Sequence, residues 1–356
     1  MKLKEFLHYT YIFPILAVLY YFSGLIGNGA VYDVIAGLLL IGSVLSAVHH
    51  AEVVAHKVGE PVETIILALC ITIIEVALII SLMVVGGDQA ITLARDTVFA
   101  AVMIILNGII GICILIGGVK YYEQFFARTS ATTYLVSIVS ILILTLVLPN
   151  FTSSVNGPFY NKAQLIFVSI ACLVIYGVFL MVQTVRHRNY FIITDEDSDS
   201  HYIPTKMATI ISFIFLVICL MIVVLMAKGL SSTIEDMVQS VGAPKSLVGV
   251  IIAAVVLLPE CVAAIRAARS NQIQSSLNLA LGSALASIGL TIPAVSIVCI
   301  MYDIPFVLGL DKKDIILLSL SVFIVMLSLS RGKTNILYGT VLLLNLAAYI
   351  FTVIVP

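Results

Sequence analysis

The chain is built as a succession of apolar runs of about 20 residues, the length that a helix needs to cross the hydrocarbon core of a membrane. Backbone polar groups in lipid must be satisfied within the chain, so runs of this length predict helices. Eleven such runs lie at residues 9–27, 30–50, 62–85, 97–119, 131–149, 163–184, 207–227, 246–264, 276–301, 312–330 and 335–355. The expected fold class is all-α, a polytopic membrane protein of about 11 transmembrane helices.

The composition excludes several classes of function. Hydrophobic residues make up 61% of the chain and charged residues 10%, whereas soluble proteins are typically about 45–50% apolar and about 25% charged. A water-soluble enzyme and a disordered chain are therefore excluded. The net charge of −1 offers no basic surface for nucleic acid. The six cysteines all lie in apolar runs without metal-ligand spacing, so we expect neither disulfides nor a bound cofactor.

The lysines and arginines predict the orientation of the chain, because short cytoplasmic loops are enriched in positive charge. With the N-terminus inside, the inner loops hold twelve of these residues: Lys2, Lys4, Lys57, Lys120, Arg128, Arg186, Arg188, Lys206, Arg266, Arg269, Arg331 and Lys333. The outer loops hold six: Arg95, Lys162, Lys228, Lys245, Lys312 and Lys313. The count favours a cytoplasmic N-terminus and an external C-terminus.

A weak internal repeat divides the chain into two halves. The segment EVVAHKVGEP at residues 52–61 resembles EDMVQSVGAP at residues 235–244, with Glu, Val, Gly and Pro in common. The two segments are five spans apart, so they face opposite sides of the membrane, which is the inverted repeat typical of transporters. We expect a leading transmembrane helix at 1–28, a first five-helix repeat at 29–184, a cytoplasmic acidic linker at 185–206 and a second five-helix repeat at 207–356.

Two acidic residues, Glu75 and Glu260, lie well inside apolar runs, each after one copy of the repeated segment. An ionised group at membrane depth costs at least about 2.5 kcal/mol, and no lysine or arginine lies at matching depth to neutralise them. If both acids meet near the midplane, either a divalent cation or two protons would cancel their charge. A transporter that changes sides only when neutralised would exchange cations for protons, because the two loads compete for the same acids.

Further oxygen ligands would be needed, because calcium takes six to eight. Thr72 lies one helical turn before Glu75, Asn107 is an amide deep in its run, and Ser283 and Ser287 share a helix face. Each could instead hydrogen-bond to a neighbouring helix.

A backbone oxygen is also available next to the second acid. Pro259 has no N–H to donate to the carbonyl of Val255, which leaves that oxygen close to Glu260. This proline predicts a broken helix at a cation site, the alternative being a kink that serves packing alone.

Four stretches resemble the calcium/cation exchanger superfamily, and most closely the bacterial calcium(sodium, potassium)/proton antiporters. They are HHAEVVAHKVGEP at 49–61, IEVALIIS at 74–81, PECVAA at 259–264 and LGSALASI at 281–288. The resemblance covers nearly the whole chain. It implies that Glu75 and Glu260 are the cation- and proton-binding acids, that Asn107, Ser283 and Ser287 lie on helices facing them, and that the protein is in the bacterial inner membrane.

The chain departs from the wider family at three positions. Proton/calcium exchangers carry Gly-Asn-x-x-Glu before each acid, whereas Thr72 and Leu257 stand here at the asparagine positions. A glutamine found in many relatives near Ala286 is absent. With fewer neutral oxygens, the site leaves room for sodium or potassium beside calcium.

Two polar segments have alternative interpretations. His49, Glu52 and His56 share one helix face at a predicted cytoplasmic end, where they could sense pH or serve as ordinary interfacial polarity. The acidic run at 195–199 could bind calcium or be a solvated linker, and it lacks the glycine and terminal glutamate of an EF-hand loop.

The sequence therefore favours a secondary antiporter that exchanges Ca²⁺, and also Na⁺ or K⁺, for H⁺ by alternating access. A sodium/calcium exchanger is the nearest alternative and a cation channel a more distant one. A membrane-embedded enzyme ranks last, because the chain has no GxGD or HExxH motif. The expected partners are the lipid bilayer, inorganic cations and protons, with the oligomeric state left open.

Overall fold

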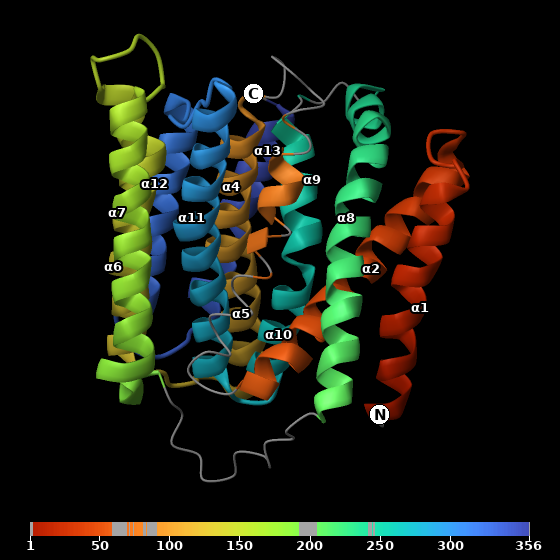
Figure 1. The fold of residues 1–356 in the computed structure, drawn as a ribbon. Helices are drawn as coiled ribbons and strands as arrows, with labels where there is room; N and C mark the ends of the chain where they lie inside the picture. Colours follow the sequence, from red (N-terminus) through yellow and green to blue (C-terminus); the bar gives the residue numbers. More distant parts are fainter. Residues whose placement is uncertain are drawn as a thin grey trace. The chain divides into compact units, whose positions relative to one another are not determined.

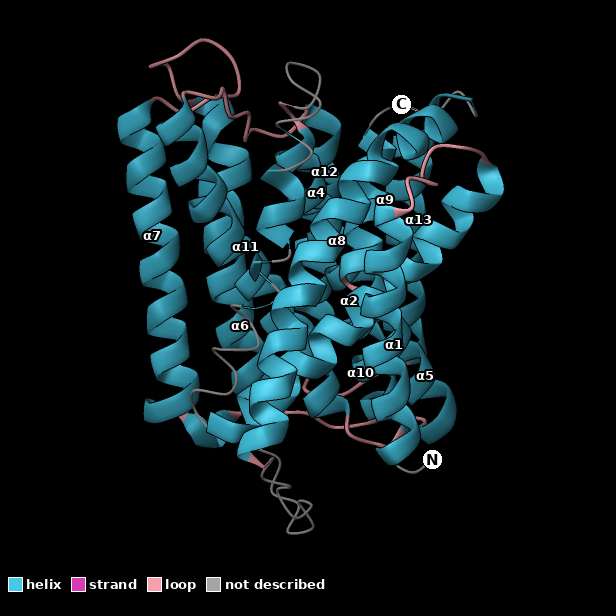
Figure 2. Cartoon of the chain, turned by 45° about the vertical axis from the view of Figure 1, so that its right-hand side comes forward, coloured by secondary structure: helices cyan, strands magenta, loops and turns pink. Residues whose placement is uncertain are grey.

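The described residues fold almost entirely into helices, as Figures 1 and 2 show. The computed structural model describes residues 3–58, 70, 72–73, 75–80, 83, 91–191, 205–240, 244 and 246–355. In these ranges, extended pairing is confined to two isolated bridges, Phe125 with Lys333 and Phe159 with Val307. The predicted all-α class of a polytopic membrane protein is confirmed.

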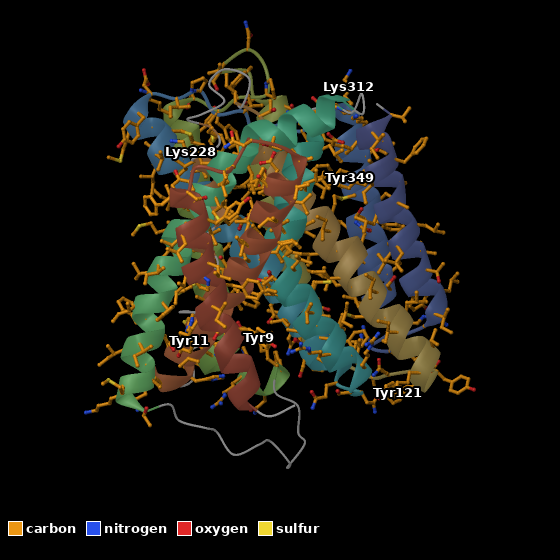
Figure 3. All side chains as sticks on the ribbon, turned by 90° about the vertical axis from the view of Figure 1, so that its right-hand side faces the viewer. Tyr9, Tyr11, Tyr121, Lys228, Lys312 and Tyr349 are labelled. Atoms are coloured by element: carbon orange, nitrogen blue, oxygen red, sulfur yellow. The ribbon has the colours of Figure 1, made fainter. Side chains whose placement is uncertain are left out.

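The helices belong to two compact units, the first made of Met1–Gly87 and Glu196–Val248. Its long described helices are α1 (Leu3–Phe22), α2 (Ala30–Val58) and α8 (Lys206–Ser240). All three pack against one another, and α2 and α8 run antiparallel (Figure 1). Tyr9 and Tyr11 lie toward one end of this unit and Lys228 toward the other (Figure 3).

The second unit is made of Asp88–Asp195 and Gly249–Pro356. Its first span joins three segments: α4 (Leu93–Met103), the π-helical turn η2 (Ile104–Ile109) and α5 (Ile110–Tyr121). The remaining helices are α6 (Arg128–Leu142) with η3 (Ile143–Val147) and η4 (Leu148–Phe151), α7 (Lys162–Met181) with η5 (Val182–Arg186) and η6 (Arg188–Tyr190), most of α9 (Ser246–Val256), α10 (Leu258–Arg269), α11 (Ile273–Tyr302), α12 (Lys312–Leu329) and α13 (Ile336–Ile354).

Each compact unit takes helices from both halves of the sequence, so the units are a different division from the two predicted repeats. The first part of each copy of the repeated segment lies at the C-terminal end of a long helix of unit 1. Glu52 lies in α2, and Glu235 lies in α8. The boundaries of the repeats stay a prediction.

The predicted spans can be followed through the described residues. Among the described residues, seven helices are long and apolar enough to cross a membrane, and the bent pair α9–α10 forms an eighth span if counted as one. The predicted span 9–27 corresponds to the shorter apolar part of α1, Tyr9–Phe22. The predicted span 312–330 is α12, whose first turn holds Lys312, Lys313 and Asp314. Within 62–85 only residues 70, 72–73, 75–80 and 83 are described, and they are helical.

Several predicted helix ends are wrong by four or more residues, among them the end of α2 and the start of α4. The span predicted at 30–50 continues to Val58, so its polar residues lie in the last turns of α2. The span predicted from residue 97 begins at Leu93, which places Arg95 inside the helix. Arg95 is only 8% exposed, and its guanidinium donates to the carbonyl of Gly309 at 2.9 Å and contacts Asp96 at 2.8 Å. The carbonyl of Gly309 and the carboxylate of Asp96 therefore satisfy the guanidinium of Arg95, a residue that hydropathy placed in a loop.

Helices α5 and α13 approach closely because glycines face each other. A Cβ atom at Gly339 would lie 2.6 Å from the backbone nitrogen of Leu115 and 2.8 Å from the carbonyl oxygen of Gly111. Small residues let helices in a membrane bring their backbones together, where packing drives their association. This contact holds α13 against the span that contains Asn107.

We expect Gly339→Ala to destabilise the protein by about 1–3 kcal/mol, because the added methyl group would overpack a backbone contact. Gly177→Ala is the matched control, because nothing lies within 4 Å of a Cβ atom at Gly177 in the middle of α7. Thermal unfolding in detergent should show a lower midpoint for Gly339→Ala alone. Equal midpoints for the two variants would contradict the packing described here.

Candidate cation-binding residues

The helix break predicted at Pro259 is present. Helix α9 ends at Val256, α10 begins at Leu258, and the two axes are bent by 53°. Pro259 lies in the first turn of α10 and has no N–H for the carbonyl of Val255, four residues earlier. The neighbouring backbone bonds continue, with the N–H of Leu257 donating to the carbonyl of Ala253 at 3.0 Å. The break thus leaves one carbonyl without its usual helical donor.

Glu260 lies in the first turn of α10, one residue after the proline. Its side chain is 5% exposed. The N-terminal end of α10 favours a negative charge there, because the first N–H groups of a helix point away from its body. The C-terminal end of α9 presents carbonyl oxygens at the same break. A carboxylate and carbonyl oxygens at one break in a helix are ligands that a hard cation can use.

The elements around α10 carry the other residues predicted for this half. Helix α10 packs against α11, α5 and the π-helical turn η2. Ser283 and Ser287 lie on α11, half-buried and buried respectively. Asn107 lies in η2 and is fully buried. The structure therefore brings their helices against the one that carries Glu260, while the role of each side chain stays a prediction.

Asn107 is engaged by two neighbouring helices. Its Nδ2 donates to the hydroxyl of Ser321 in α12 at 2.9 Å, and its Oδ1 accepts from Nδ2 of Asn345 in α13 at 3.4 Å. The hydroxyl of Ser321 donates in turn to the carbonyl of Leu317 at 2.7 Å. These bonds correspond to the alternative in which the amide joins helices. The π-helical turn was not predicted, although such turns are frequent at functional sites.

Glu75 belongs to the first compact unit and is also 5% exposed. Thr72, one turn earlier in the helical stretch, is buried to the same degree. Residues three apart share a helix face, so the hydroxyl and the carboxylate lie on one side. Both acids that the sequence singled out are therefore buried, although a charged side chain prefers water.

The C-terminal part of α2 holds the three predicted polar residues and one buried histidine that was not predicted. His49 is half-buried, whereas Glu52 and His56 are exposed, as expected for a polar face. The neighbouring His50 is fully buried. Its ring centroid lies 5.1 Å from that of Tyr11 and 5.4 Å from that of Phe215. Sequence reasoning missed this contact between three helices, because nothing in the adjacent pair of histidines says which of them is buried.

One further prediction cannot be compared with the structure. The acidic run at 195–199 lies outside the described residues.

The chain matches the sodium/calcium exchanger protein family over residues 29–185 and 211–355. Among similar proteins, y4hA of Sinorhizobium fredii, whose name describes an ionic transporter, is 44% identical over 322 residues, with 89% of this chain and 87% of that protein covered. The sodium-potassium/proton antiporter ChaA of Escherichia coli is 34% identical over 353 residues, with 96% and 95% covered.

A solved structure shares the fold over nearly the whole chain. The structure of native YfkE matches with a TM-score of 0.72 at 19% sequence identity, and the match covers 99% of this chain and 100% of that one. At that identity the likeness is one of fold.

We expect Pro259→Ala to restore an N–H group that can reach the carbonyl of Val255, and so to weaken cation binding at this break. Amide hydrogen exchange over residues 253–262 should slow, and the rise of the unfolding midpoint on adding Ca²⁺ should shrink. Pro14→Ala, which removes a proline from the unbroken helix α1, is the control and should leave the Ca²⁺ effect unchanged. Slower exchange with an undiminished Ca²⁺ effect would rule out a role for the freed carbonyl.

Proposed function

The chain belongs to the sodium/calcium exchanger protein family, and from that premise we propose that it is a secondary antiporter that exchanges Ca²⁺, and also Na⁺ or K⁺, for H⁺. It acts as a transporter and not as an enzyme. The observation that carries this function is the burial of Glu75 and Glu260, each 5% exposed within an apolar helical chain. Cation and proton are alternative loads for these two carboxylates.

Exchange follows from the energy of a buried charge. A carboxylate taken out of water is costly unless it is protonated or paired. We propose that the chain changes sides only while the charge on both acids is cancelled, by protons on one leg of the cycle and by cation on the other. The two acids belong to different compact units. The proposal therefore concerns the charge state of each acid and not the distance between them, and it is tested by measuring exchange.

The identity of the cation depends on the neutral oxygens that support the acids. Leu257, at a position where wider relatives have asparagine, is a buried apolar side chain and supplies no oxygen. The candidates that remain are Thr72, Ser283 and Ser287, the carbonyl of Val255, and Asn107 if its present bonds rearrange. A site with few neutral ligands accepts monovalent cations more readily than a complete calcium cage. A relative that is 34% identical is named as a sodium-potassium/proton antiporter, which supports including these ions.

The proposal includes two five-helix repeats of opposite orientation at 29–184 and 207–356. The antiparallel packing of α2 and α8, each carrying one copy of the repeated segment, supports this symmetry (Figure 1). It also includes the bacterial inner membrane, with the N-terminus in the cytoplasm and the C-terminus outside. In everted vesicles, a C-terminal tag should therefore be protected from added protease.

We expect Glu75→Gln and Glu260→Gln each to reduce exchange to the background of vesicles that lack the protein, because either change removes a titratable charge. Everted vesicles with an acidic interior, carrying a pH-sensitive dye, report proton efflux when Ca²⁺, Na⁺ or K⁺ is added. Glu123→Gln is the matched control, because it neutralises an exposed glutamate outside the candidate residues and should retain activity.

Competition between the three cations in this assay identifies the preferred one. Exchange that survives in both buried-acid variants would refute the mechanism. Cation flux without any proton movement would point to a channel.

A further inference from the structure

Helices α6 and α7 enclose a groove on the outside of the second unit, and no function has yet been assigned to it. Its volume is about 900 Å³, which falls in the range of about 300–1,000 Å³ typical of small-molecule sites. The two helices lie side by side at one edge of this unit (Figure 1). The groove extends from Arg128, the first residue of α6, to Ser140.

The wall of the groove that α7 supplies is apolar. From α7, Val174 and Val178 line it with 57% and 50% of their surface exposed. The α6 wall carries hydroxyls, but those of Thr133, Ser137 and Ser140 donate to the carbonyls four residues earlier, at 2.7, 3.1 and 2.7 Å. Their hydrogens therefore point toward the backbone of α6, and this part of the groove suits hydrocarbon. Thr129 and Thr132, close to Arg128 in the sequence, keep the charged end of the groove polar.

One end of the groove is positively charged. Arg128 is exposed, and no acidic side chain among the described residues pairs with it. The nearby Glu123 is already bound to Lys333 at 2.8 Å. Tyr190, which follows the end of α7, lines the same end. The carboxylate-free lining means that an occupant must bring the negative charge itself.

We propose that this groove binds one anionic phospholipid, with its phosphate on Arg128 and its acyl chains along α6 and α7. The length of the groove matches a lipid that belongs to one leaflet of the bilayer. Twelve residues separate Arg128 from Ser140, which is about 18 Å of helix, and half the hydrocarbon core is about 15 Å thick. A helix from a second copy of this chain would instead follow α6 through both leaflets. Basic pockets between transmembrane helices are a known form of lipid recognition.

The test uses the full-length protein purified in detergent and incubated with dioleoylphosphatidylglycerol. Native mass spectrometry should detect retained lipid, and the unfolding midpoint should rise. Arg128→Gln should bind about tenfold more weakly, as expected for the loss of one charged contact. Val178→Trp should also lose binding, because its ring fills the chain-binding part while the arginine stays. Arg331→Gln, which removes an exposed arginine outside the groove lining, should bind like the wild type.

Two further ligands separate the sources of the effect. Dioleoylphosphatidylcholine and inorganic phosphate should each give little stabilisation, because one has no net charge and the other no acyl chains. Stabilisation by phosphate alone, or undiminished lipid binding in Arg128→Gln and Val178→Trp, would overturn the proposal. A dimer or larger species that dissociates in Val178→Trp without any change in lipid would overturn it as well. The unfolding midpoint of each variant without added lipid shows whether the substitution destabilises the fold itself.

Discussion

The cost of holding a carboxylate out of water is the constraint on which the rest of the structure depends. Glu75 and Glu260 are almost completely buried in a chain that has, among its described residues, seven helices long and apolar enough to cross a membrane. A structure can keep such groups only if something cancels or solvates the charge. In the proposed mechanism, acids that must be neutralised, and can be neutralised by cation or by proton, couple the two ions to each other. Exchange then follows from burial.

The surrounding fold supports this arrangement by breaking helical regularity where polar groups are needed. At the break between α9 and α10, Pro259 supplies no N–H for the carbonyl of Val255, and the π-helical turn η2 places Asn107 against α12 and α13. Irregular backbone at membrane depth is tolerated only where protein or water covers it. The close approach of α5 and α13 at Gly111 and Gly339 keeps the second irregularity enclosed.

The apolar runs were enough to predict an all-helical membrane protein, and a single proline was enough to locate the helix break. Helix ends were harder, because hydropathy treats Arg95 as a loop residue although Gly309 and Asp96 satisfy it within a helix. The partners of Asn107 could not be predicted, since Ser321 is 214 residues away and only packing brings them together. The buried contact of His50 with Tyr11 and Phe215 has the same origin.

Proton release on cation binding tests the central claim most directly. Purified protein in weakly buffered detergent solution is titrated with Ca²⁺ while the pH is recorded, and binding is measured in parallel by calorimetry. The account predicts that each bound cation displaces protons, and that the displacement disappears in the double variant Glu75→Gln/Glu260→Gln. Tight cation binding with no displaced protons across the pH range, or an equal displacement in the double variant, would contradict it.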